Sequence, residues 1–235
     1  MIPIKKGPEP LFLAARRQEA MKKGYDANKA YGKLKSKHKK KIRECLVSEQ
    51  GNLCAYCMCE IPRGDVDESI TPITIEHYVA RSLDTGVCNK GLDYQNMLAV
   101  CHGNKGPTGT RNPEDWTCDV HRGNMEFKKV NPLDASTLES IFYTQKGEID
   151  ATDPDVRYDL NTVLNLNSPT APLISERKST LDGMQLEIEN DLAELSEDSY
   201  KSYYENLLYK LENEKGKKTP YVGILIWYLR DLLHK

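Results

Sequence analysis

Apolar and polar positions repeat along this chain with two periods, and these periods predict its helices and strands. Residues 8–23 begin with a proline and continue with apolar positions at helical spacing, and Gly24 ends this pattern. After a lysine-rich run, Ile42 and Leu46 continue a second helical pattern that stops at Gly51. The first fifty residues are therefore predicted to be helical.

A short strand is predicted at residues 73–78. Ile73 and Ile75 alternate there with polar residues, which is typical of a half-buried strand. Because successive side chains of a strand point to opposite faces, Glu76 and His77 are expected to have separate roles.

The C-terminal part shows a hairpin pattern followed by helical patterns. Residues 140–149 predict a hairpin with a turn at Gly147, and residues 158–166 have alternating apolar positions. The segment Asn167-Ser168-Pro169 is suited to capping a helix. Beyond Gly183, apolar residues recur at helical spacing, namely Met184, Ile188, Leu192, Leu195, Tyr203, Leu207 and Leu211. The last helix begins at Pro220, and since it is apolar nearly all round it must be buried.

These patterns predict an α+β protein that is mainly helical and has three parts. Residues 1–50 form a helical arm with a basic helix. Residues 51–135 form a core that contains the chemically interesting motifs, and residues 136–235 form the hairpin and a helical C-terminal region.

Composition restricts the class of protein. The 235 residues are 39% hydrophobic and 29% charged, with a net charge of -2, so any binding to nucleic acid must use local basic patches. The chain has no apolar run long enough for a transmembrane helix, and its charged, proline-rich start predicts no signal peptide. We therefore expect a cytoplasmic protein without a membrane partner.

Two pairs of cysteines predict a structural zinc site. Cys54 and Cys57 form a C-x-x-C knuckle, in which two thiolates can bind one tetrahedral zinc ion. Cys101 and Cys118 flank a loop rich in glycine and proline, which can bring them together to complete four thiolate ligands. Other candidate ligands are Cys59 and His102, and the remaining cysteines are Cys45 and Cys88.

Four motifs in this order resemble a known family. They are EHYVARS, LDYQNMLAVC, CDVHRGN and VNPLD, and they lie densely within residues 48–135. This combination is similar to the HNH endonucleases of the ββα-metal class, and more closely to the PtuB-like nucleases of Septu-type and retron-associated anti-phage systems. The resemblance implies that the core is a zinc-stapled, treble-clef-like ββα-metal fold with helical extensions at both ends.

The resemblance also implies roles for single residues. His77 matches the general base that activates water, and Asn96 matches the central asparagine that positions the histidine. Glu76 stands at the position of a ligand to a catalytic Mg²⁺ or Mn²⁺ ion. The second ligand is Asp119, or alternatively His121, which lies two residues further on.

Basic residues near these motifs are candidates for binding phosphate. Arg122 stands where the family usually has lysine, and Arg81 lies four residues beyond His77. Arg81 suits either a phosphate contact or a surface ion pair. Lys39, Lys40 and Lys41 belong to the lysine-rich run, which is either a solvated helix face or a nucleic-acid contact.

Two kinds of function fit these features. The first is a metal-dependent endonuclease that cleaves DNA or RNA in an anti-phage system. For this function the resemblance implies a PtuA-like ATPase partner, and in retron systems a reverse transcriptase with its RNA and DNA. The second is a zinc-stapled module that binds nucleic acid or assembles partners without catalysis. Only the enzyme requires His77 to act beside Glu76 and Asp119.

Overall fold

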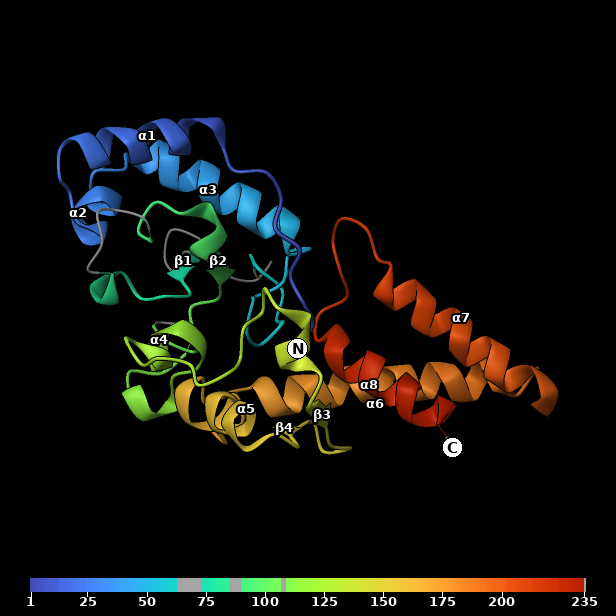
Figure 1. Cartoon of the computed structure of the whole chain (residues 1–235). Coiled ribbons are helices and arrows are strands. Elements are labelled where there is room, and N and C mark those ends of the chain that lie inside the picture. The colour runs from blue at the N-terminus through green and yellow to red at the C-terminus, as the bar shows by residue number, and fades with distance from the viewer. Residues whose placement is uncertain (63–72, 85–89, 107–108, 235) are drawn as a thin grey trace.

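The computed structural model describes residues 1–62, 73–84, 90–106 and 109–234, and it is an α+β structure that is about half helical. Figure 1 shows two small sheets surrounded by helices. The helices are α1 (Leu11–Lys22), α2 (Ala27–Gly32), α3 (Ser36–Glu49), α4 (Cys118–Arg122), α5 (Pro154–Tyr158), α6 (Leu173–Leu192), α7 (Tyr200–Glu212) and α8 (Val222–Leu233). The strands are β1 (Thr74–His77), β2 (Met97–Val100), β3 (Ile141–Tyr143) and β4 (Ile149–Ala151).

The N-terminal helices cover the first sheet. Ile42 and Leu46 are fully buried, and α3 packs against both β1 and β2. The prediction of helices at the start of the chain is confirmed, but α2 is an additional element. The side chain of Asp26 begins α2 by accepting a hydrogen bond from the backbone N–H of Lys29.

The first sheet consists of β1 and β2, which pair antiparallel with Thr74 opposite Val100 and His77 opposite Met97. β1 confirms the strand predicted from alternation. All four residues of β2 are buried, so this strand has no polar face from which a period of two could be recognised. Buried Gln50, just beyond α3, holds β2 in place because its amide both donates to the Ala99 carbonyl and accepts from the Ala99 N–H.

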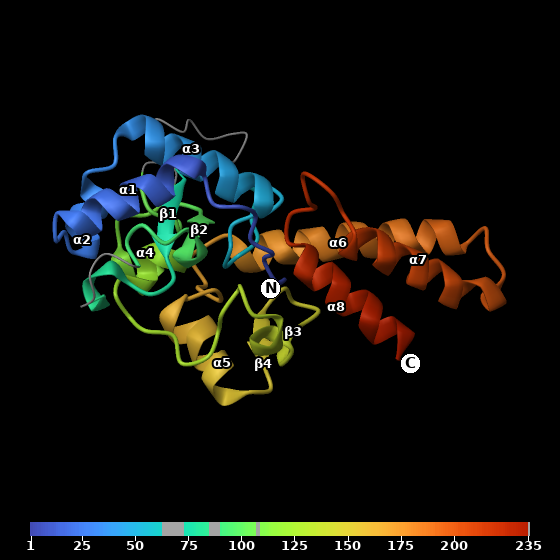
Figure 2. The ribbon, with the colours of Figure 1, turned by 45° about the horizontal axis from the view of Figure 1, so that its top comes forward.

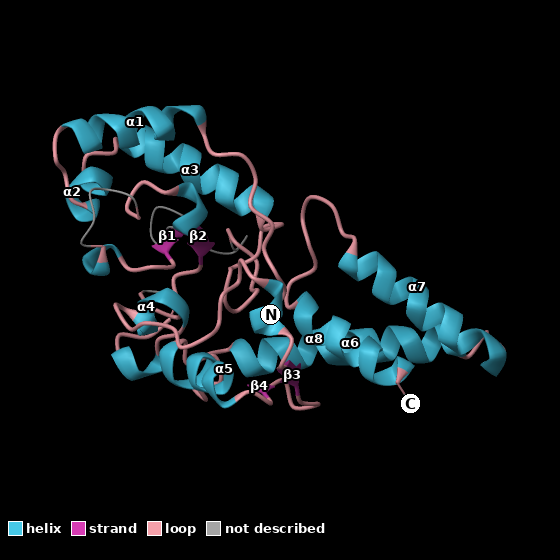
Figure 3. Ribbon diagram, viewed as in Figure 1, coloured by secondary structure: helices cyan, strands magenta, loops and turns pink. Residues whose placement is uncertain are grey.

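The second sheet is the predicted hairpin of β3 and β4, seen below the helices in Figure 3. Its turn contains Gly147 with a φ of 87°, where a side chain would collide with the carbonyl of Ile174. The alternating apolar positions of residues 158–166 do not lie in a strand, because Asp159–Val163 form a π-helical turn that continues α5. Asp159 is fully buried in this turn and accepts hydrogen bonds from the backbone N–H groups of residues 128–130.

Three C-terminal helices extend away from the N-terminal part in Figures 1 and 2. The helix expected beyond Gly183 begins earlier, at Leu173, and contains Gly183 in its interior. The cap expected at residues 167–169 is wrong, since Pro172 immediately precedes α6. Burial of the last helix is confirmed: α8 packs against α6, α7 and β3. None of the helices in the described residues is long and apolar enough to cross a membrane.

A single connected hydrophobic core includes residues from all three predicted parts, among them Leu46, Leu98 and Leu225. The parts therefore pack on one another. Their boundaries at residues 50 and 135 stay a prediction, because a continuous core marks no division.

Candidate functional site

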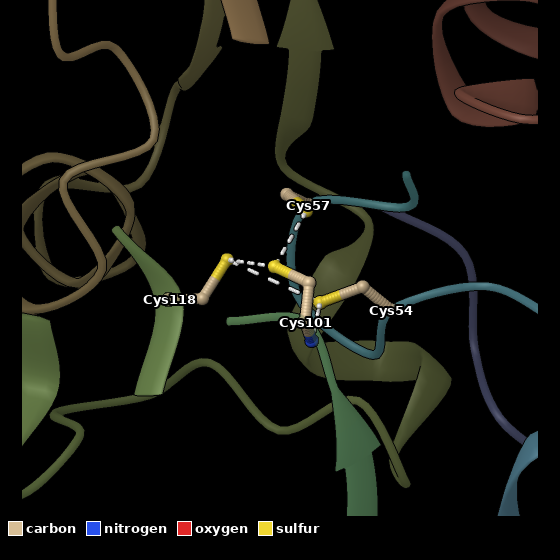
Figure 4. A group of neighbouring side chains, drawn as sticks. All are labelled: Cys54, Cys57, Cys101 and Cys118. Carbon is tan, nitrogen blue, oxygen red and sulfur yellow. Dashed lines mark hydrogen bonds between the residues drawn. The ribbon is translucent and has the colours of Figure 1, made fainter. Parts of the chain in front are cut away.

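Four buried cysteine thiols meet between the knuckle, the end of β2 and the start of α4. Figure 4 shows the side chains of Cys54, Cys57, Cys101 and Cys118 pointing toward one another. The Sγ atoms of the four residues all lie within 4.8 Å of each other. Among the residues that the structure describes, these four are the group that could hold a metal ion.

Local backbone contacts bring the four thiols together. The knuckle joins β2 through a hydrogen bond from the Ala55 N–H to the Ala99 carbonyl. Between Cys101 and Cys118, Gly103 has a φ of 59°, and a Cβ atom there would lie 2.2 Å from the carbonyl oxygen of Thr117. Only glycine permits this close approach, which closes the loop and returns Cys118 to the cluster.

The thiol geometry fits a tetrahedral zinc ion. Four sulfur ligands about 2.3 Å from zinc lie about 3.8 Å apart. The Sγ distances are 4.0 Å from Cys54 to Cys118, 3.7 Å from Cys57 to Cys101, and 3.8 Å from Cys101 to Cys118. The neighbouring Cys118 thiol lowers the pKa of Cys101 to about 5, which favours the thiolate form that binds metal.

The other candidate zinc ligands lie outside this group. Cys59 is buried beside the cluster and His102 is half-buried, but neither belongs to the set of four. Cys45 lies on α3, and Cys88 is outside the described residues. The donor set is therefore a four-sulfur site that could hold a structural metal such as zinc.

Glu76 is a buried carboxylate on β1 with three hydrogen bonds from within the chain. Its Oε1 atom accepts from the Tyr56 hydroxyl at 3.1 Å and from the Arg122 guanidinium. Its Oε2 atom accepts from the backbone N–H of His77 at 2.9 Å.

Asp119, on the first turn of α4, lies beside Glu76. Burial and the neighbouring Asp119 carboxylate together raise the pKa of Glu76 well above its usual range. Carboxylate oxygens are the kind of ligand that suits Mg²⁺ or Mn²⁺. A cation site at Glu76 and Asp119 stays a prediction.

The His121 side chain contacts the π-helical turn that follows α5 and not Glu76. Its Nδ1 atom lies 3.1 Å from the carbonyl oxygen of Val163, in the π-helical turn. Residues two apart on a helix do not share a face, so His121 and Asp119 cannot both face Glu76. Between the two alternatives for the second ligand, this geometry favours Asp119.

His77 lies on the opposite face of β1 from Glu76, as the alternation of the strand requires. Its Nε2 atom is 3.1 Å from the Gly91 carbonyl oxygen, which can only accept, so Nε2 carries the proton and Nδ1 is the unprotonated nitrogen. Burial, together with the nearby charge of Arg81, lowers the pKa of His77 to about 4. The imidazole is therefore neutral at pH 7.

Asn96 joins the two segments on either side of His77. Its Nδ2 atom donates to the carbonyl oxygens of Val79 and Lys90, and its Oδ1 atom accepts from the Val79 N–H. The backbone carbonyl of Lys90 precedes Gly91, the partner of the imidazole. Asn96 thus ties Val79 to Lys90, next to the residue that contacts the imidazole, and its positioning role stays a prediction.

Three of the predicted site residues contact the ring of Tyr31, which lies on α2. His77 contacts it edge-on, with ring centroids 4.8 Å apart. The guanidinium of Arg81 lies 4.4 Å from the centre of the ring, and the Lys39 Nζ atom lies 4.6 Å from it. Two positive groups are therefore fixed close to the imidazole. Lys40 and Lys41 are exposed further along α3.

Arg122 is buried beside Glu76. Its side chain is only 2% exposed, and its nitrogen atoms donate to Glu76 and to the carbonyl oxygens of His77, Tyr78 and Met125. Arg122 forms an ion pair with the buried Glu76 carboxylate and ties α4 to β1, and a phosphate contact by Arg122 stays a prediction.

Two tyrosines of the site were not predicted from the sequence. Tyr56 stands inside the C-x-x-C knuckle, where an aromatic residue between two metal ligands is a signal that it points inward. Tyr31 lies on the short helix α2, which the Asp26 cap could have revealed. Their partners are distant in sequence, so no local pattern shows their contacts.

The described residues therefore contain a four-thiol cluster, a buried carboxylate near Asp119, and a neutral histidine on the other face of β1. The chain is 32% identical over 103 residues to an Escherichia coli protein named "Retron Ec83 putative HNH endonuclease". The alignment covers 40% of this chain and 36% of that protein, so it spans little more than a third of the relative. No family model matches the chain. The similarity supports an HNH-type nuclease and suggests a retron setting.

Proposed function

We propose that this protein is a metal-dependent HNH endonuclease that hydrolyses phosphodiester bonds of nucleic acid. The observation that carries the proposal is the meeting of Glu76 and Asp119, with His77 adjacent to Glu76 on β1. The arrangement of β1, β2 and α4 around the four thiols supports a ββα-metal core. The test is cleavage of single-stranded DNA, duplex DNA and RNA with Mg²⁺ or Mn²⁺, compared with the same reactions in EDTA.

The residues suggest a division of tasks. His77 takes a proton from water through Nδ1, and the resulting hydroxide attacks phosphorus while the ester oxygen leaves. Glu76 and Asp119 would hold a divalent ion, which when bound supplies positive charge to the phosphate oxygens and the leaving group. Arg81 and Lys39, both fixed on Tyr31, would orient the phosphate. His77 and Glu76 are only 3% and 6% exposed, so substrate binding must displace the groups that cover them.

The charge distribution supports nucleic-acid binding by the N-terminal helices. Residues 1–50 contain 14 lysines and arginines and 5 aspartates and glutamates, although the whole chain has a net charge of -2. The exposed lysines of α3 lie on the same part of the molecule as Lys39 and Tyr31, next to His77. A polyanion bound on α3 would therefore reach the proposed catalytic face.

Replacing Lys39, Lys40 and Lys41 by glutamine is expected to weaken binding of nucleic acid of any sequence. Each lost phosphate contact lowers the slope of log affinity against log salt by about 0.9 for duplex DNA, so the slope should fall by about 2 to 3. Fluorescence anisotropy at several salt concentrations measures it. The matched control replaces three exposed lysines of the α7 region, namely Lys201, Lys210 and Lys215. If the slope of log affinity against log salt is the same in both variants, the lysines of α3 do not contact the nucleic acid.

We further propose that the enzyme acts in the cytoplasm in retron-associated anti-phage defence. The similarity to the Escherichia coli retron protein supports this setting. We also propose two partners on the resemblance of the motifs alone. One is a PtuA-like ATPase, and the other is a reverse transcriptase with its RNA and DNA. The partner proposal predicts that an ATPase encoded next to this protein co-purifies with it after co-expression. Recovery of this chain alone at physiological salt would argue against the partner.

A further inference from the structure

The knuckle that holds two of the thiols also contacts the proposed catalytic carboxylate. Tyr56 stands between Cys54 and Cys57, and its hydroxyl donates to Glu76 Oε1 across 3.1 Å. The Tyr56 side chain is fully buried. A phenol keeps its proton at neutral pH, so the hydroxyl acts as a donor.

Packing fixes the direction of the Tyr56 ring. Its centroid lies 5.6 Å from that of Phe127, in a tilted arrangement, and Phe127 also stacks on Tyr78 at 5.4 Å. The backbone on both sides of Tyr56 belongs to cluster ligands. The hydroxyl therefore has little freedom, and a metal bound by the four thiols would fix it further.

We propose that Tyr56 is a positioning residue for Glu76, and that it couples occupancy of the four-thiol site to the affinity of Glu76 and Asp119 for a divalent cation. The inference rests on the proposed function, because it assigns the carboxylate pair as the cation site. Tyr56 and Arg122 donate to Oε1 and the His77 N–H donates to Oε2, so these three bonds fix the orientation of the carboxylate. Donors that orient metal ligands in this way commonly change metal affinity by about 10- to 100-fold.

The substitution Tyr56→Phe removes the hydroxyl and keeps the ring that packs on Phe127. We expect Mn²⁺ to bind about tenfold more weakly, and not to be lost, because Arg122 still holds the same oxygen of Glu76. Binding is measured by electron paramagnetic resonance of free Mn²⁺ on the zinc-loaded protein without nucleic acid. Zinc content, measured by mass spectrometry, should be that of the parent.

Tyr78→Phe is the matched control. It removes a hydroxyl from a tyrosine on the same Phe127 ring, but that hydroxyl donates to the Val130 carbonyl at 3.1 Å and not to Glu76. Mn²⁺ affinity should stay at the parent value. An equal loss in both variants would show that packing around Phe127, and not the bond to Glu76, sets the affinity, which would overturn the inference.

Glu76→Gln separates the inference from the proposed function. If Glu76→Gln abolishes Mn²⁺ binding while Tyr56→Phe binds like the parent, the inference is overturned and the carboxylate site remains. If Glu76→Gln binds like the parent, both the cation site and the inference are overturned. Loss of zinc from Tyr56→Phe would also overturn the inference, because the hydroxyl would then be maintaining the knuckle.

Discussion

Replacing His77 by alanine is expected to reduce nucleic-acid cleavage by about 10² to 10⁴-fold, the usual contribution of a positioned general base. The free Nδ1 atom is the only acceptor on this ring, because Nε2 donates to the Gly91 carbonyl. Mn²⁺ affinity and zinc content should not change, since His77 and Glu76 lie on opposite faces of β1. Single-turnover cleavage at saturating Mn²⁺ measures the chemical step.

His121→Ala provides the control for this experiment and also decides between the two candidate ligands. His121 is held by the Val163 carbonyl away from Glu76, so its removal should leave cleavage within about threefold of the parent. Asp119→Asn should abolish cleavage together with Mn²⁺ binding. Parent-like cleavage by His77→Ala would show that His77 is not the general base, whereas absence of cleavage by the parent protein with Mg²⁺ or Mn²⁺ would favour the zinc-stapled binding module.

The parts of the site that lie close in sequence could be predicted. Alternation of Ile73 and Ile75 with polar residues gave β1, and the strand period alone separated Glu76 from His77. The spacing of the cysteines gave the thiol cluster, because a loop with Gly103 at its start can close on itself. These signals are local, and local backbone geometry was enough to interpret them.

The unpredicted parts depend on contacts between distant segments. The resemblance gave Arg122 as a phosphate contact, but no local pattern shows that Arg122 is buried in an ion pair with Glu76. The pattern at residues 158–166 suggested alternation, but Asp159 must turn inward to accept three backbone N–H groups. Tyr31 became part of the site only through packing of α2 beside β1. Periodicity carries no information on such pairings.

The substitution Cys118→Ser is expected to reduce zinc content sharply and to lower the free energy of unfolding by at least about 4 kcal/mol. Structural zinc in small metal-dependent domains contributes about 10 to 16 kcal/mol of apparent binding free energy at pH 7, and part of it is lost with one ligand. The four thiols join the knuckle, the end of β2 and the start of α4, so the loss should release all three segments. Urea unfolding and metal analysis measure the two effects.

Cys59→Ser is the matched control, because Cys59 is equally buried beside the cluster but lies outside the set of four thiols. It should keep the zinc of the parent, whereas loss of zinc would mean that Cys59 is a ligand.

Cys118 is also adjacent to Asp119, and Cys57 is adjacent to Tyr56. Loss of the cluster should therefore weaken Mn²⁺ binding although no cysteine contacts that ion. A Cys118→Ser protein that lost zinc but bound Mn²⁺ like the parent would show that the carboxylate pair is held by the hydrophobic core and the Arg122 ion pair alone.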